Sequence, residues 1–339
     1  MEKEAPERKK KSHFGLKFLG FLLFLLLLAA LVLYIIPLTE TDKGGRIDGA
    51  GDWMAQLPNE RPLNELAIPG THDSATHFVT LGFFGKCQTK SIADQLEAGF
   101  RYLDIRLAVD KDKPGLKLMH GFVNCRTNPL PWAATLYLDE VLKQCYEFLD
   151  KHPTETILFA VKQEHGKDAV ADFQRLLDNY IVLNADRWLL TDTMPTLGEA
   201  RGKLVLLRRY EDEANLGANA GISLIWDGQG STGDMNQSTA FRDNGSYTLW
   251  VQDRYSYPVE EKWTAFIGGL GAGSNQEGAL TLSFLSTKGK LPFGHPYKYA
   301  SDLNNRLLGR ELRAEDGWII VDFATAPLAK HIYEANFHS

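Results

Sequence analysis

The chain is poor in cysteine, with three in 339 residues, and none stands in a Cys-x-x-Cys pair. No His-x-x-x-His spacing occurs either, so neither pattern suggests a metal site. Internal repeats and low-complexity tracts are also absent, which leaves the alternation of apolar and polar segments as the guide to the fold. The composition, 44% hydrophobic and 24% charged, suits one large globular domain or two small ones.

Positive charge is scarce beyond the N-terminus. The chain has 37 basic and 43 acidic residues, and residues 1–38 hold six and three of them, so the remainder has a net charge of −9. A generic nucleic-acid binder would show a basic face, and non-specific attraction to anionic lipid headgroups would need one as well. An anionic substrate must therefore be bound by a local basic site.

One long hydrophobic run stands near the N-terminus. Residues 18–36 carry no charge and match the ~20 residues that cross a bilayer as a helix. Basic residues precede the run, so the positive-inside rule predicts a cytoplasmic N-terminus and an extracytoplasmic remainder. A cleaved signal peptide of a secreted protein is the alternative, although residues 34–37 are a poor cleavage site. We expect a cytoplasmic basic tail at 1–17, a transmembrane signal-anchor helix at 18–37, a linker at 38–60 and a folded domain at 61–339.

Strand patterns and helical patterns alternate through that domain. Helical stripes are expected at 91–96, 136–149, 169–181 and 327–336. Strands are expected at 64–69, 101–107, 116–120, 156–163, 203–209, 247–253, 279–285 and 317–322. Eight strands interleaved with helices predict a single (β/α)8 barrel, distorted because the gap between strands two and three is too short for a helix. A doubly wound sheet is the alternative.

The most informative run is LAIPGTHDSAT at 66–76. Its apolar start breaks at Pro69-Gly70 and presents His72 and Asp73 at a sharp turn, which suits proton transfer or, more simply, turn formation. Arg106 lies on the second strand and His120 ends the third. Two imidazoles can deprotonate an attacking hydroxyl and protonate a leaving oxygen, while a guanidinium binds phosphate oxygens. The set therefore indicates in-line displacement at a phosphodiester.

Several later strands also end in ionisable residues, and the site of a (β/α)8 barrel lies at the carboxyl ends of its strands. These residues are Lys162, Glu164, Arg208, Arg209, Asp253, with Tyr255 two positions on, and Asp322. A register shift of one residue would put Arg208 at the site in place of Arg209. Lys162 and Arg209 could instead form surface ion pairs with Glu164 or Asp212.

Together these runs resemble the X domain of bacterial phosphatidylinositol-specific phospholipase C. The likeness spans roughly 60–325 and comprises LAIPGTHDSAT, RYLDIRL, LMHG, HPTETILFAVKQE, LGEARGKLVLLRRY, VQDRY and GWIIVDF, in that order. The resemblance implies an irregular (β/α)8 barrel. It also implies cleavage of phosphatidylinositol-type lipids to diacylglycerol and inositol 1,2-cyclic phosphate.

The resemblance implies a role for each site residue. His72 matches the general base that deprotonates the inositol 2-hydroxyl, and Asp322 matches the carboxylate that orients it. His120 matches the general acid, with Asp73 assisting on the leaving-group side and Arg106 holding the phosphate. The residues that match the grip on inositol are Lys162, Arg209, Asp253 and Tyr255.

The resemblance also bears on cofactors and partners. Eukaryotic members bind calcium through an Asn after the first histidine and a Glu-x-Asp on the second strand, where this chain has Asp73 and Asp104-x-Arg106. A guanidinium thus stands where a calcium ligand would be. We expect no metal and no other cofactor, and activity that survives chelation. The expected partner is a phosphatidylinositol-type lipid in a membrane, not a nucleic acid.

Two local features allow two interpretations each. Cys87 and Cys125 each follow a site strand, so they could form a disulfide in an oxidising compartment or could be unrelated thiols. The run HFVTLGFF at 77–84 could be an apolar rim that dips into a membrane or a packed lid.

Two other functions stay open. A glycerophosphodiester phosphodiesterase shares a barrel and a histidine pair, but it would want a metal and a Glu-x-Asp cluster. A non-catalytic inositol-lipid-binding barrel would have no use for a matched acid and base.

Overall fold

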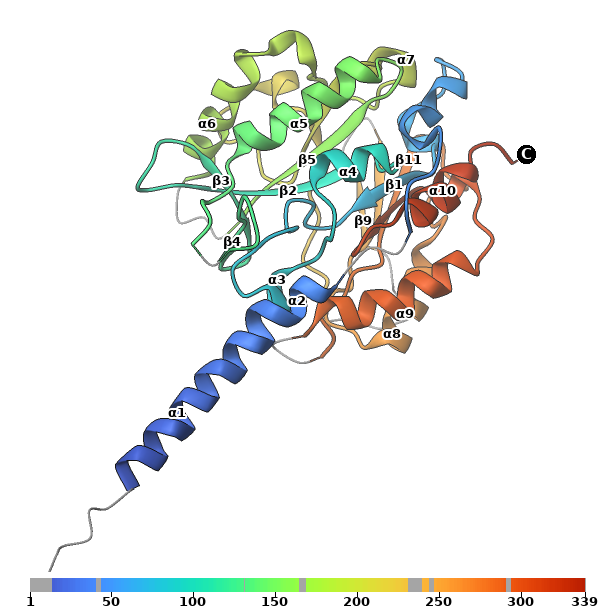
Figure 1. Cartoon of the computed structure of the whole chain (residues 1–339). Coiled ribbons are helices and arrows are strands. Elements are labelled where there is room, and N and C mark those ends of the chain that lie inside the picture. Colours follow the sequence, from blue (N-terminus) through green and yellow to red (C-terminus); the bar gives the residue numbers. More distant parts are fainter. Residues whose placement is uncertain are drawn as a thin grey trace, which may run out of the picture.

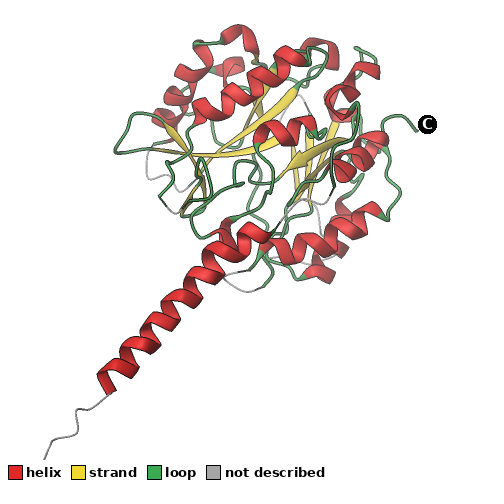
Figure 2. Ribbon diagram, viewed as in Figure 1, coloured by secondary structure: helices red, strands yellow, loops and turns green. Residues whose placement is uncertain are grey.

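The computed structural model describes residues 14–40, 44–130, 132–164, 169–230, 240–243, 247–290 and 294–338. An N-terminal helical rod leads into a domain whose helices surround a curled sheet (Figures 1 and 2). Most of the expected cytoplasmic tail, 1–17, lies outside the described residues.

The rod consists of α1 (Phe14–Ala30), a π-helical segment η1 (Leu31–Ile35) and α2 (Ile36–Thr39). Its residues Gly15–Thr39 are long and apolar enough to cross a membrane, and the most apolar stretch is not covered by the domain. The π-helical segment comes just before Pro37, whose ring lacks the N–H of a regular helical turn. Figure 1 shows α1 projecting away from the domain.

Seven of the eight expected strands form one parallel sheet. They are β1 (Ile68–Thr71), β2 (Tyr102–Val109), β5 (Ile157–Gln163), β7 (Leu204–Arg208), β10 (Thr248–Gln252), β11 (Ala279–Phe284) and β12 (Trp318–Val321). Their spatial order is β7-β5-β2-β1-β12-β11-β10, so the last strand returns beside the first. A doubly wound sheet reverses its order at a switch point. The observed order is therefore that of a barrel.

The third expected strand is not a barrel strand, and that expectation was wrong. β3 (Leu116–His120) pairs antiparallel with β2, for example at Leu107↔Leu118, and with β4 (Val123–Asn124). A parallel crossover needs a dozen or more residues, so the short connection from β2 permits only a reversal. The hairpin nevertheless brings His120 to the strand ends where the site lies.

Short strands that the sequence pattern did not reveal complete the sheet. β6 (Trp188–Leu189) and β8 (Ile222–Ser223) pair parallel with β7, and β9 (Ala240–Asp243) pairs antiparallel with β10. Within the described residues β8 and β9 do not pair with each other, so the sheet is curled but open there.

Helices cover the outside of the sheet (Figure 2). Four match expectation: α4 (Ile92–Glu97), α5 (Leu138–Lys151), α6 (Val170–Val182) and α10 (Ala326–Glu334). The others are α3 (Gly82–Gly85), α7 (Leu197–Ala200), α8 (Val259–Gly269) and α9 (Pro296–Leu308). α5 buries the stripe that the sequence predicted, including Leu142, Cys145 and Leu149.

Part of the expected linker at 38–60 packs into the domain. Ala50–Gln56 form a 3-10 helix whose Trp53 and Met54 are buried. The Met54 N–H donates to Glu155, which forms a fully buried ion pair with Arg101 at 2.7 Å. Both charges are thus paired and hydrogen-bonded, as burial requires.

Candidate active site

The site is a pocket of about 530 Å³ lined by residues from several strand ends. Eight of the nine expected site residues line it: His72, Arg106, His120, Lys162, Arg209, Asp253, Tyr255 and Asp322. The ninth, Asp73, is 2% exposed and contacts three of them.

His72 follows β1 and Asp322 follows β12, and the parallel pairing of these strands brings the two residues together. The Nδ1 of His72 lies 2.8 Å from Oδ1 of Asp322, so an Nδ1–H donates to the carboxylate and Nε2 faces the pocket side of the ring. Burial disfavours the charged imidazole, but the carboxylates of Asp322 and Asp73 outweigh it and raise the pKa of His72. Such a pair suits a general base.

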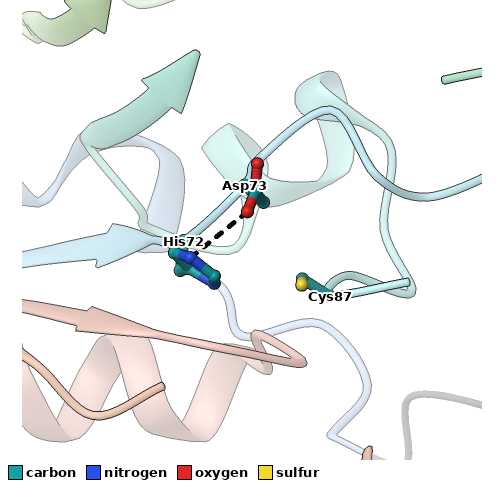
Figure 3. A group of neighbouring side chains, drawn as sticks. All are labelled: His72, Asp73 and Cys87. Atoms are coloured by element: carbon teal, nitrogen blue, oxygen red, sulfur yellow. Dashed lines mark ion pairs between the residues drawn. The ribbon is translucent and has the colours of Figure 1, made fainter. Parts of the chain in front are cut away.

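Asp73 occupies the sharp turn after β1. Its φ of 43° lies in the left-handed region, which Asp tolerates better than most residues, and its N–H donates to Asp104. Its Oδ2 lies 3.2 Å from Nε2 of His72 and 3.3 Å from Nε2 of His120. Figure 3 shows the ion pair with His72. One carboxylate therefore lies between both imidazoles.

His120 ends β3 and lies across the pocket from His72. The ring centroids are 6.1 Å apart and the rings are nearly perpendicular, at 82°. The Nδ1–H of His120 donates to the carbonyl of Gly85 at 2.8 Å, which leaves Nε2 to face Asp73. The Nδ1–H of His72 thus donates to a carboxylate, whereas the Nδ1–H of His120 donates to a backbone carbonyl.

Arg106 lines the same pocket and is held by carboxylates. Its guanidinium contacts Asp104 at 2.9 Å and Asp73 at 3.0 Å. Burial opposes the charge on Asp104, but Arg106 and Arg209 outweigh it and hold the pKa of Asp104 well below its ordinary value. Burial likewise opposes the charge on Arg106, yet the same carboxylates raise its pKa. The cation is fixed in position.

The residues expected to grip a headgroup line the same pocket. Lys162 pairs with Glu164 at 2.7 Å. Burial opposes the Glu164 charge, but Arg106 and Lys162 outweigh it and lower the pKa of Glu164 to about 2. Tyr255 is 41% exposed, with Lys288 over its ring at 5.7 Å. The pocket therefore offers charged groups and an exposed aromatic face.

Of the two neighbouring arginines that could reach the site, Arg209 lines the pocket. Its guanidinium contacts Asp104 at 3.0 Å, not Asp212, whereas Arg208 donates to the carbonyl of Tyr210. Arg209 also lies over the ring of Trp226 at 4.0 Å, and the Trp226 indole donates to Asp253.

Two lining residues, Glu164 and Trp226, and the fully buried Asp104 were not among the expected site residues. Asp104 shares a strand face with Arg106, and this alternation was a usable signal. Glu164 was noted as an ionisable residue at a strand end and as a surface partner of Lys162, without a role in the site. Trp226 follows the two-residue β8, which gives no sequence periodicity, so nothing marked it.

The possible Cys87–Cys125 disulfide is not formed: both thiols are free and buried. The two side chains belong to different environments. Cys87 lines the pocket with its Sγ 3.8 Å from Nδ1 of His120, whereas Cys125 packs in the core with Leu118 and Leu138.

Ligand atoms of His72, Asp73 and Cys87 lie within 4.8 Å of one another, close enough to share a cation (Figure 3). The set fits a metal poorly. Arg106 already contacts Asp73 at 3.0 Å. Burial and the nearby carboxylates raise the pKa of Cys87, so its thiol stays protonated, and thiolate is the metal-binding form.

Residues 60–210 match the family model described as phosphatidylinositol-specific phospholipase C, X domain. This part of the chain is similar to that X-domain family. A 1-phosphatidylinositol phosphodiesterase of Staphylococcus aureus is 28% identical over 290 residues, which cover 80% of this chain and 88% of the relative. Its counterpart in Listeria monocytogenes is 29% identical over 300 residues, covering 84% of each.

The phosphatidylinositol-specific phospholipase C structure from Listeria monocytogenes superposes on this chain with a TM-score of 0.65 at 26% identity. The match covers 85% of this chain and 98% of the other. The expected barrel class and the expected resemblance to this family are thereby confirmed.

Proposed function

We propose that the protein is a metal-independent phosphatidylinositol-specific phospholipase C that forms diacylglycerol and inositol 1,2-cyclic phosphate. The observation that carries this proposal is the pair of imidazoles, His72 and His120, 6.1 Å apart in one pocket with Arg106. The relatives named 1-phosphatidylinositol phosphodiesterase supply the substrate class.

His72 acts as the general base. Its Nδ1–H is held by Asp322, so Nε2 accepts the proton of the inositol 2-hydroxyl as that oxygen attacks phosphorus. The carboxylates around the ring stabilise the imidazolium that forms.

His120 acts as the general acid. Its Nδ1–H is fixed on the Gly85 carbonyl, so the protonated Nε2 faces inward beside Asp73. As the phosphorus–oxygen bond to glycerol breaks, Nε2–H passes its proton to the leaving oxygen. Asp73 lies 3.3 Å from this nitrogen, which fits the leaving-group role expected for it.

Arg106 stabilises the charge on the phosphate oxygens. Its contacts with Asp104 and Asp73 hold the guanidinium in place before substrate binds. Because the Arg106 guanidinium already neutralises the charge of these carboxylates, the contacts support a mechanism without a metal ion. Lys162, Arg209 and Asp253 bind inositol hydroxyls, and Tyr255 offers its ring face to the sugar.

The helix at 18–37 serves as an uncleaved anchor, with the N-terminus cytoplasmic and the catalytic domain extracytoplasmic. The apolar run Gly15–Thr39 and the basic residues before it support this arrangement. The substrate is then a lipid of the membrane in which the protein sits.

Phosphorus NMR of the full chain with phosphatidylinositol micelles in excess EDTA tests the function. We expect a cyclic phosphate resonance that grows with time. His72→Ala and His120→Ala each slow it at least ~10²-fold, the scale of a lost general acid or base. His331→Gln is the matched control, because His331 bonds the Arg310 carbonyl outside the pocket. Wild-type rates in either alanine variant, or an absolute need for calcium, would contradict the proposal.

A further inference from the structure

The N-terminal rod is docked onto the catalytic domain by a buried carboxylate. Glu40 directly follows α2 and is 6% exposed. Its Oε1 lies 2.7 Å from Nε2 of His295, and its Oε2 lies 4.0 Å from Nζ of Lys86. The same Lys86 ammonium donates to the carbonyl of Pro37 at 2.6 Å. We call Glu40, Lys86 and His295 the juxtamembrane clamp.

Both partners of Glu40 belong to walls of the active-site pocket. Lys86 lies between Gly85 and Cys87, which line the pocket, and His295 lies between the lining residues Gly294 and Pro296. Glu40 therefore joins two pocket walls that are some two hundred residues apart in the chain.

A second set of contacts ties the two walls together at the same place. The His295 ring stacks on Phe83, with centroids 4.1 Å apart and planes within 2°, and its Nδ1–H donates to the Phe83 carbonyl. The Glu40 carboxylate then accepts from the opposite nitrogen. Burial opposes charge on this ring, but the hydrogen bonds to Glu40 and to the Phe83 carbonyl, with the Glu40 charge, together outweigh it and raise the pKa of His295.

The wall that carries Lys86 also sets the position of His120. The Gly85 carbonyl accepts from Nδ1 of His120. Packing leaves this segment little freedom: a Cβ on Gly85 would lie 2.7 Å from Val123, and one on Gly82 would lie 3.0 Å from Pro37. α3 is thus held between the rod and the β3–β4 hairpin (Figure 1). Of the two interpretations of the run at 77–84, this packing favours the packed lid over the apolar rim.

We infer that the juxtamembrane clamp is a working part of the active site: Glu40 is a positioning residue that fixes the Gly85 carbonyl and, through it, the general acid His120. The inference rests on the proposed function. A buried carboxylate facing two cationic groups leaves them without a counter-charge when it is removed, so the segment at 82–87 loosens. The membrane helix then serves catalysis as well as attachment.

The test compares two soluble inositol phosphodiesters that differ in leaving group. A nitrophenol leaves without being protonated, whereas an alkyl alcohol needs the general acid. In the full chain in detergent, Glu40→Ala should lower kcat on the alkyl ester about tenfold, and change kcat on the nitrophenyl ester less than about twofold. His120→Ala sets the limiting pattern, and Glu40→Gln should fall between Glu40→Ala and wild type.

The matched control is Glu147→Gln, which breaks an exposed helical pair with Lys143 and should leave both rates unchanged. A loss by Glu40→Ala that is equal on both esters would overturn the positioning role, and so would no loss on either.

Hydrogen exchange at 82–87 gives a readout that needs no turnover. The Lys86 and Gly85 amides are bonded to the Gly82 and Leu81 carbonyls, and Glu40→Ala should speed their exchange. Unchanged exchange would refute the clamp. Should wild type cleave neither ester, the proposed function fails, and the exchange result still decides whether the clamp exists.

Discussion

Asp73 is the residue on which the charges of the site converge. Its Oδ2 lies within 3.3 Å of His72, Arg106 and His120, although those residues come from three different strands. The family resemblance implied a leaving-group role for Asp73. The sequence could not indicate that one carboxylate oxygen is shared by both imidazoles and the guanidinium, since sharing depends on how the strands are juxtaposed.

Asp322→Asn tests the state of His72. His72 must be neutral to act as a base, so activity is lost as the pH falls through its pKa, which Asp322 and Asp73 raise against the effect of burial. Removing the Asp322 charge lowers that pKa and moves the acidic limb of kcat/KM to lower pH, while kcat falls at least ~10²-fold. A pH–rate profile of wild type and Asp322→Asn checks this. An acidic limb that does not move would show that Asp322 does not control the pKa of the catalytic base.

At the same scale, motif position was enough to predict that His72, Arg106, His120 and Asp322 share one pocket, because each stands near a strand end. It was not enough to distinguish Arg208 from Arg209, which took the register of β7. Buried partners such as Asp104 are also hard to see in a sequence, since their role lies in what they contact and not in where they stand.

At the scale of elements, strand content was predictable and strand pairing was only partly so. Long apolar runs revealed the seven parallel strands of the barrel. The sequence showed that the β2–β3 connection is too short for a helix, but the antiparallel hairpin that follows from this was not predicted. Two-residue strands such as β6 and β8 have no period to detect.

α8 contains a fully buried lysine, Lys262, whose Nζ donates to Gln252 on β10 at 2.9 Å. Burial lowers the pKa of Lys262 from 10.5 to about 7. The unfolded chain therefore binds more protons between these values, and the free energy of unfolding rises with pH across that range.

Lys262→Met should raise the unfolding midpoint at pH 7 by about 2 °C or more. It should also flatten the rise in stability between about pH 7 and 10. Gln252 stays satisfied because its Oε1 also accepts from the Arg254 N–H. Lys290→Met, at an exposed pair with Glu261, is the control and should change neither quantity. Thermal unfolding followed by circular dichroism from pH 6 to 10 checks both effects, and a lower midpoint for Lys262→Met would show that the charged form is stabilising.

At the scale of the whole molecule, the proposed anchor and the surface charge have complementary consequences. The part beyond residue 38 has a net charge of −9, so it gains no general attraction to anionic lipid. The apolar rod, docked through the juxtamembrane clamp, would instead keep the pocket beside one membrane. Local concentration would then come from attachment and not from charge.

Vesicle experiments test this directly. The full chain reconstituted with phosphatidylinositol should cleave lipid of its own vesicle at a rate that dilution with buffer does not change. Added vesicles of labelled phosphatidylinositol should stay largely intact, because the anchored protein does not exchange between membranes. Leu25→Lys combined with Leu26→Lys places two charges in the apolar run, each costing about 3 kcal/mol at a bilayer centre, and should allow cleavage of the added vesicles. Equal cleavage of both vesicle populations by the unaltered chain would mean that the N-terminal helix does not hold the protein in a membrane, and that the chain acts as a released enzyme.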